Sequence, residues 1–91
     1  MNRCEKTLLI VNKLGLHARA ATKLAQLSQQ FEANITISLD DNSADAASIM
    51  GLMLLAGGQG KTVKVLAEGK DAKQALASIC QLFSDKFDEN E

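Results

Sequence analysis

Gly15, His17, Arg19 and Lys23 form a short group of residues that could bind and transfer a phosphoryl group. The neutral nitrogen of a histidine is nucleophilic near neutral pH. His17 stands just before an expected helix, whose first turn presents unpaired N–H groups and partial positive charge, both of which suit phosphate. Arg19 could contact phosphoryl oxygens through several N–H donors, and Lys23 adds charge one turn later. Gly15 would leave the approach to the ring open.

The same spacing also fits an ordinary exposed histidine, or one that caps or flanks a helix. No pair of carboxylates lies near His17, and no order of Ser, His and Asp suggests a triad. Cys4 and Cys80 lack metal-site spacing, and there is no second histidine, so we expect neither a metal nor a cofactor.

Length and composition limit the class of protein. The 91 residues suffice for one domain, spanning 1–91. Aromatic residues are 3% of the chain, without Trp or Tyr, which argues against stacking on nucleic-acid bases. A net charge of −1 gives little attraction to DNA or a membrane surface, and the longest apolar stretch, 49–58, is too short to span a bilayer. The start of the chain lacks a signal-peptide core, so we expect a cytoplasmic protein.

Charge is unevenly distributed along the chain. Residues 1–23 contain five Lys or Arg against one Glu, whereas residues 85–91 contain four Asp or Glu against one Lys. We therefore expect any anion-binding site to lie early in the sequence. The acidic tail is expected to be a loose, solvated chain end.

Hydrophobic periodicity and turn residues predict alternating strands and helices. Four segments are expected to be strands: 5–12, 34–39, 43–46 and 62–68. Three segments are expected to be helices: 17–30, 49–55 and 71–84. Ser48 is a suitable N-cap for the second helix, and Asp71 with Gln74 resembles a capping box for the third.

The resulting order, βαββαβα, predicts the α+β class. Polar and apolar residues alternate along the strands, so one face of the sheet can be exposed to water. Each helix has one apolar stripe, which can cover the other face. We therefore expect a two-layer open-faced sandwich, in which three helices cover one face of a four-stranded antiparallel sheet.

The run Gly15-Leu16-His17-Ala18-Arg19 resembles the active-site signature of the HPr family of phosphocarrier proteins. The signature is specific when it lies between a first strand and a first helix, and the resemblance spans essentially the whole chain in element order. The segments 13–17 and 82–89 are most similar to the nitrogen-related branch of the family.

The resemblance implies a shuttle rather than a turnover enzyme. His17 would be phosphorylated at Nδ1 by an enzyme I-type kinase that uses phosphoenolpyruvate, and would pass the group to an enzyme IIA-type acceptor. Arg19 would neutralise the phosphoryl group during each transfer. The protein would act mainly by positioning and charge stabilisation, and we expect a monomer.

The resemblance also implies a docking surface. In the family, the start of the second helix lies beside the active histidine, and its exposed apolar side meets partners. We expect partner contacts at five residues: Ala18, Lys23, Ile49, Met50 and Met53. Methionine's flexibility suits two different partners. The alternative is that the apolar residues of this helix all belong to the core.

Two further positions can be compared with the family. Ser48 aligns with a serine that a regulatory kinase phosphorylates in some members, although an N-cap role is sufficient for it here. The family usually has Pro at the position of Ala20, and its absence suggests a looser active loop.

Other functions stay open at this point. The chain could be a regulatory module whose docking is toggled by phosphorylation of His17, or an HPr of the sugar branch. A small hydrolase with an acylphosphatase-like sandwich would need an Arg and an Asn placed to orient water, and no such pair is evident in the sequence.

Overall fold

The computed structural model describes residues 2–89 of the chain. Seven helices and strands follow one another in this part: β1 (Arg3–Leu9), α1 (Ala18–Ser28), β2 (Asn34–Leu39), β3 (Asn42–Asp45), α2 (Ile49–Leu54), β4 (Thr62–Glu68) and α3 (Ala72–Ser84). A short 3₁₀ turn, η1 (Lys86–Asp88), ends the series. The expected order βαββαβα is confirmed.

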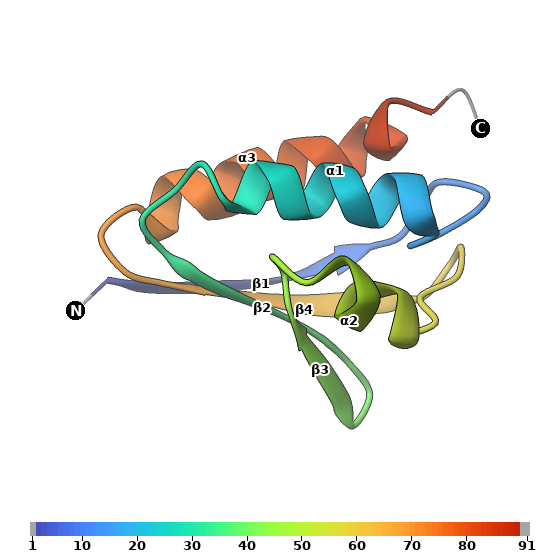
Figure 1. Cartoon of the computed structure of the whole chain (residues 1–91), viewed down its shortest axis with the longest axis horizontal. Coiled ribbons are helices and arrows are strands. Elements are labelled where there is room, and N and C mark those ends of the chain that lie inside the picture. The colour runs from blue at the N-terminus through green and yellow to red at the C-terminus, as the bar shows by residue number, and fades with distance from the viewer. Residues whose placement is uncertain (1, 90–91) are drawn as a thin grey trace.

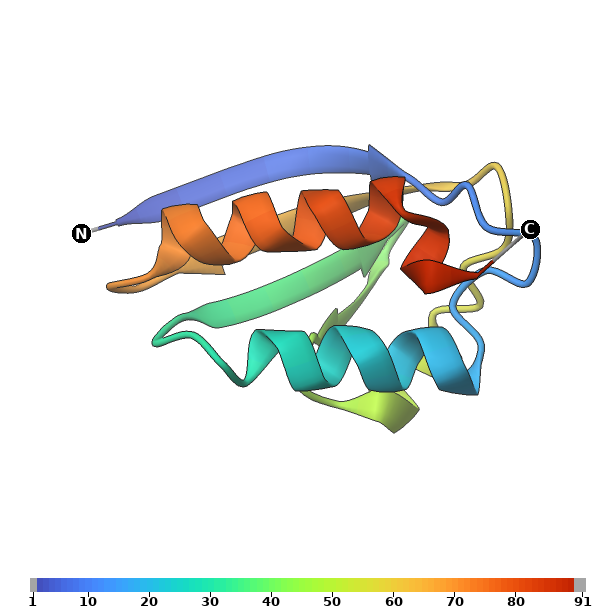
Figure 2. The same ribbon diagram turned by 90° about the horizontal axis from the view of Figure 1, so that it is seen from above.

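The four strands form one antiparallel sheet in the order β1-β4-β2-β3. Alternate residues of the central strands point into the core, so that Ile35 stands opposite Ala67 and Ile37 opposite Val65, all buried. Helices α1 and α3 run side by side over this face, with α2 below α1 at the β3 side (Figures 1 and 2). The expected open-faced α+β sandwich with three helices is therefore confirmed.

The first strand, β1, ends at Leu9, three residues earlier than the sequence predicts. Its ladder with β4 stops at the pair Leu9 and Thr62, rather than continuing to residue 12. Beyond this pair the backbone of Ile10 still bonds to the segment before β4: its N–H donates to the carbonyl of Lys61 (2.9 Å), and its carbonyl accepts from the N–H of Gly60 (2.8 Å). Asn12 then turns inward as a fully buried polar side chain. The expected strand at 5–12 included residues that instead build a loop.

The other boundaries differ by one or two residues, and the expected capping box at α3 is wrong. The Asp71 side chain makes no capping bond to its own helix. Its carboxylate instead accepts a hydrogen bond from the backbone N–H of Glu32 (2.9 Å), which ties α3 to the turn before β2. At α2 the prediction is confirmed, because Ser48 Oγ accepts from the Gly51 N–H (3.0 Å).

The acidic tail was expected to be loose, and for residues 85–89 this is wrong; residues 90–91 lie outside the described part. Phe87 is fully buried, and its ring lies 4.9 Å from that of Phe83. Lys86, Phe87 and Asp88 all adopt positive φ angles, between 55° and 63°. Left-handed backbone is unfavourable for such residues, so burial of the Phe87 ring must offset it. The tail consequently turns from the end of α3 toward the first turns of α1 (Figure 2).

Within residues 2–89, no helix is long and apolar enough to cross a membrane.

The glycine that precedes the helix α1 offers a test of this architecture. Gly15 has a φ of +66°, and a Cβ there would lie 2.2 Å from the carbonyl oxygen of Gly57. Gly15→Ala should lower the free energy of unfolding by about 1–3 kcal/mol, measured by urea denaturation. Gly58→Ala is the control, because a Cβ at Gly58 meets nothing within 4 Å and needs no left-handed backbone. Equal losses in both variants would contradict the predicted crowding at Gly15.

Candidate functional site

The loop between β1 and α1 is fixed before it reaches His17. The buried Asn12 side chain donates from Nδ2 to the carbonyl of Gly15 (2.8 Å), and the Gly15 N–H donates back to the Asn12 carbonyl (3.2 Å). The next N–H, from the buried Leu16, donates to the Gly57 carbonyl (2.8 Å). These bonds set the position at which helix α1 begins.

His17 is the N-cap residue of α1. Its backbone is extended, and its carbonyl accepts the first intrahelical bond from the N–H of Ala21 (2.8 Å). Its side chain makes no capping bond and is 26% exposed. The imidazole therefore stands at the positive end of the helix, reachable from solvent.

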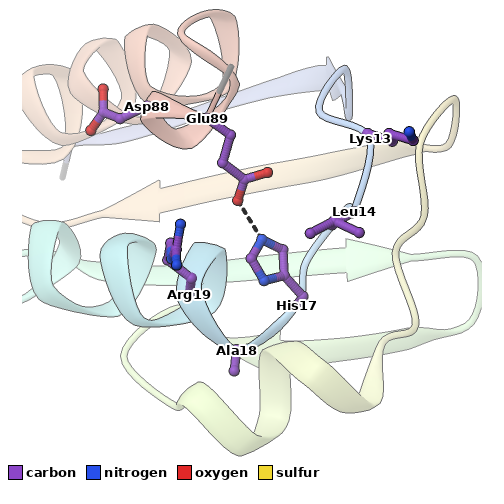
Figure 3. A pocket seen from close by; sticks show the side chains of 7 residues that line it. All are labelled: Lys13, Leu14, His17, Ala18, Arg19, Asp88 and Glu89. Carbon is purple, nitrogen blue, oxygen red and sulfur yellow. Dashed lines mark hydrogen bonds and ion pairs between the residues drawn. The ribbon is translucent and has the colours of Figure 1, made fainter. Parts of the chain in front are cut away.

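A pocket of about 610 Å³ opens around this ring (Figure 3). Its lining residues are Lys13, Leu14, His17, Ala18, Arg19, Asp88 and Glu89. Arg19 and Ala18 are both exposed, and they come from the first turn of α1. Cationic side chains and the helix N-terminus thus surround a nucleophilic nitrogen, which is the arrangement that phosphoryl binding requires.

A carboxylate also contacts the ring, from a residue that lies 72 positions later in the sequence. Glu89 Oε2 contacts His17 Nε2, and Glu89 Oε1 accepts from Asn12 Nδ2 (3.1 Å). The Glu89 side chain is only 10% exposed. No pair of carboxylates near His17 was evident in the sequence, and this contact with Glu89 was not predicted from it.

We call residues 86–89 the C-terminal clasp. Phe87 anchors it in the core, and Lys23 holds it from α1 by donating from Nζ to the Phe87 carbonyl (3.0 Å) and to Asp88 (3.3 Å). Lys23 is therefore engaged with the clasp and is half-buried. The sequence did contain a signal for this, because Phe87 follows Phe83 by four residues and extends the apolar stripe of α3 into the acidic segment.

Opposing effects act on the Glu89 carboxyl. Burial raises the pKa of Glu89, but the hydrogen bonds from His17 and Asn12 and the positive charges of His17 and Arg19 together leave that pKa below its ordinary value. The ionised carboxylate is thus the form that the folded protein favours.

The expected docking residues lie on the surface of α2. Ile49 is 38% exposed, Met53 43% and Met50 73%, while Leu52 is fully buried. The helix is therefore not entirely core, contrary to the alternative considered above. Two apolar side chains that sequence reasoning passed over are also exposed, Leu54 at 79% and Leu14 at 66%, the latter in the pocket wall.

The remaining sequence candidates can be placed as well. Ala20, where the family usually has Pro, is fully buried in the first turn of α1. Cys4 and Cys80 are free and half-buried. Across residues 2–89, no three His, Cys, Asp or Glu side chains are grouped so that they could hold a metal ion.

Comparisons with known proteins agree with this site. The family model described as the PTS HPr component phosphorylation site matches residues 4–85. A relative in Shewanella violacea, phosphocarrier protein NPr, is 53% identical over 98% of both chains. The crystal structure of HPr-C-His from Thermoanaerobacter tengcongensis has a TM-score of 0.92 and 40% identity, covering 97% of this chain and 99% of that one. An HPr dimer from the same organism matches with a TM-score of 0.77 and 41% identity, covering 88% and 92%.

The chain belongs to the HPr family. It is a phosphocarrier protein of the phosphotransferase system.

The clasp predicts a particular dependence of stability on pH. Because the pKa of Glu89 is lower in the folded protein, its stabilisation is complete above the pKa of an unfolded glutamate and is lost as pH falls through the folded value. Glu89→Gln should cost about 1 kcal/mol of unfolding free energy near pH 6, and the difference from the unmodified chain should vanish in acid.

Urea denaturation at several pH values between 6 and 2.5 measures this difference. Glu32→Gln provides a matched control, because Glu32 is 74% exposed and its ion pair with Lys70 spans 3.9 Å. A penalty for Glu89→Gln that stays constant into acid would show that the carboxylate charge is irrelevant to the clasp.

Proposed function

We propose that His17 is the phosphoryl acceptor of this carrier. It would take the group at Nδ1 from an enzyme I-type kinase that uses phosphoenolpyruvate, and deliver it to an enzyme IIA-type protein. One observation carries the proposal. His17 is the N-cap residue of α1, but its partly exposed imidazole makes no capping hydrogen bond. A histidine that served only as a cap would use that bond.

Arg19 is proposed to stabilise the phosphoryl charge. It lines the pocket from the first turn of α1, two residues after the acceptor, and its side chain is exposed. Its guanidinium can reach oxygens that the backbone N–H groups of the helix start do not bind. Charge stabilisation and positioning are the main requirements of phosphoryl transfer, so no cofactor is needed.

Partner proteins are proposed to dock beside the acceptor. Helices α1 and α2 pack against each other, and Ala18 projects on the α2 side of the pocket (Figure 3). The docking patch consists of Ala18, Ile49, Met50 and Met53. Lys23, the fifth expected contact, is instead hydrogen-bonded to the clasp at the Phe87 carbonyl and Asp88. An apolar patch next to the reactive ring would let one surface serve both the donor and the acceptor protein.

The similarity to NPr supports a place in the nitrogen-type branch, since the Shewanella violacea NPr is 53% identical to this chain, against 44% for the phosphocarrier protein HPr of Cupriavidus necator. We further propose that the carrier works in the cytoplasm as a monomeric single domain. Nucleic acid and membranes are not expected partners. Ser48 already caps α2 through Oγ, so a regulatory phosphate there is a secondary possibility.

The acceptor assignment can be tested by incubation with phosphoenolpyruvate and enzyme I. His17→Gln should receive no acid-labile phosphate, since the chain contains no other histidine. Arg19→Ala should keep the site but accept phosphate about 10²-fold more slowly, as expected on losing a charge-stabilising donor. Lys73→Ala removes a positive charge from the other end of the molecule and should match the unmodified protein. Full labelling of His17→Gln would reject the acceptor assignment.

The docking patch predicts a selective loss of partner affinity. Met50→Asp should raise the KM for the IIA-type acceptor about tenfold, because a charge in the centre of an apolar contact costs more than 1 kcal/mol. Leu9→Asp alters a half-exposed leucine on the open face of the sheet and serves as the control. Similar KM changes for both variants would argue against a localised patch on α2.

A further inference from the structure

The C-terminal clasp places a carboxylate where the proposed reaction can use it. Residues 88 and 89 lie beyond the part of the chain that the family model matches, which ends at residue 85. The contact of Glu89 with the imidazole therefore needs an explanation from this chain's own geometry. The contact pairs residues 72 positions apart in the sequence.

We propose that Glu89 is a positioning residue for His17: its carboxylate accepts a hydrogen bond from the N–H at Nε2, so that the lone pair of the ring stays on Nδ1 and faces the incoming phosphoryl group. The proposal deepens the acceptor role proposed above and rests on it. In a neutral imidazole, the hydrogen bond made by one nitrogen decides which nitrogen carries the proton. A carboxylate can only accept, so its neighbour Nε2 must be the protonated one.

The two ring nitrogens have different surroundings. Nε2 points at Glu89, and the other nitrogen lies on the far side of the ring, toward the start of α1 (Figure 3). His17 makes no side-chain capping bond, so Nδ1 is not occupied by the helix start. One nitrogen is thus held while the other is left available for reaction.

The carboxylate is itself held in place rather than free to swing. Asn12 is fully buried and donates from Nδ2 both to the Gly15 carbonyl (2.8 Å) and to Glu89 Oε1 (3.1 Å). Rotating the amide would turn its oxygen toward two acceptors, so this orientation is required. The buried ring of Phe87 fixes the backbone two residues before Glu89. Glu89 is therefore held at its carboxylate by Asn12 and at its backbone by the buried Phe87.

The transfer balances with this proton arrangement. The Nδ1 lone pair forms the new N–P bond, while the bond from phosphorus to the donor atom breaks and its electron pair leaves with the donor. The proton on Nε2 stays in place, so the ring acquires a positive charge. The Glu89 carboxylate, in contact with that proton, stabilises the charge as it develops. Delivery to the next protein runs through the same steps in reverse.

The same carboxylate could in principle act in the opposite sense, by repelling an incoming phosphoryl group. Its contact is on Nε2, and Arg19 also lines the pocket as a compensating positive charge. This geometry favours the positioning role. The two roles predict opposite changes in rate when the carboxylate is removed, so an experiment can separate them.

Potassium phosphoramidate is a suitable probe, because it phosphorylates histidine without any partner protein. The full-length chain, Glu89→Gln and Glu89→Ala are each treated with it, and NMR of ³¹P and ¹⁵N identifies the modified nitrogen. The unmodified chain should yield only the Nδ1 phosphate. Glu89→Ala should form this phosphate about tenfold more slowly, as for loss of an orienting partner, and should also yield the Nε2 isomer that the carboxylate normally blocks. Glu89→Gln should be intermediate, since its amide oxygen accepts a hydrogen bond without the charge.

Glu32→Gln, which removes one negative charge far from the site, should behave as the unmodified chain. An unchanged isomer and rate in Glu89→Ala would overturn the proposal, and faster Nδ1 phosphorylation would replace it with an inhibitory clasp. The ¹H–¹⁵N spectrum of each variant shows whether the clasp stays folded, so that a change in the isomer ratio can be assigned to the carboxylate rather than to loss of the clasp. Failure of enzyme I to phosphorylate a chain that phosphoramidate does modify at Nδ1 would instead reject the proposed function while leaving this role of Glu89 intact.

Discussion

The geometry of the site depends on a single buried amide. Asn12 has no exposed surface, yet its Nδ2 donates to the loop that leads into α1 and to the carboxylate that arrives from the end of the chain. A buried N–H donor without an acceptor is costly, so both segments are drawn to Nδ2, while the buried Oδ1 of the same amide has no hydrogen-bond partner among the described residues. The loop sets where His17 caps the helix, and the carboxylate sets what its ring faces. One side chain thus links the beginning of the chain, its end and the reactive histidine.

The sheet and helices could be predicted from the sequence because their signals are local. Strict alternation at 34–39 and 62–68 predicted β2 and β4 at their observed bounds, and Ser48 predicted the start of α2. The motif around His17 and Arg19 identified the candidate site before any geometry was available. These features depend only on neighbours within a few positions of one another.

The clasp could not be predicted in the same way, because its determinants are distant in the sequence. Asn12 and Glu89 are 77 positions apart, and Lys23 and Phe87 are 64 apart. Three consecutive residues with left-handed backbone contain no glycine to indicate the turn. The spacing of Phe87 from Phe83 was the one available sign, and the acidic residues around it suggested a solvated end instead. The shortened β1 leads into a contact of the same kind, since Asn12, beyond the end of the strand, donates to Glu89 Oε1 (3.1 Å).

His17 is held in place on one side and is open to solvent and partner proteins on the other. The clasp and the loop hold His17 from one direction, while Ala18 and the exposed apolar residues of α2 face solvent in the other. A carrier that meets two proteins in turn needs such a division, because the reactive group must be presented in the same way to each. Specificity can then reside in the surface around it, without changing the chemistry at the ring.

The central claim concerns the passage of one phosphoryl group through one imidazole. Its most direct measurement follows ³²P from labelled phosphoenolpyruvate in a mixture of enzyme I, this protein and the IIA-type acceptor, sampled over time. The account predicts a transient, acid-labile signal on the fragment containing His17, followed by label on the acceptor only when the carrier is present. Acid-stable label on a serine, or acceptor labelling that proceeds equally without the carrier, would contradict it.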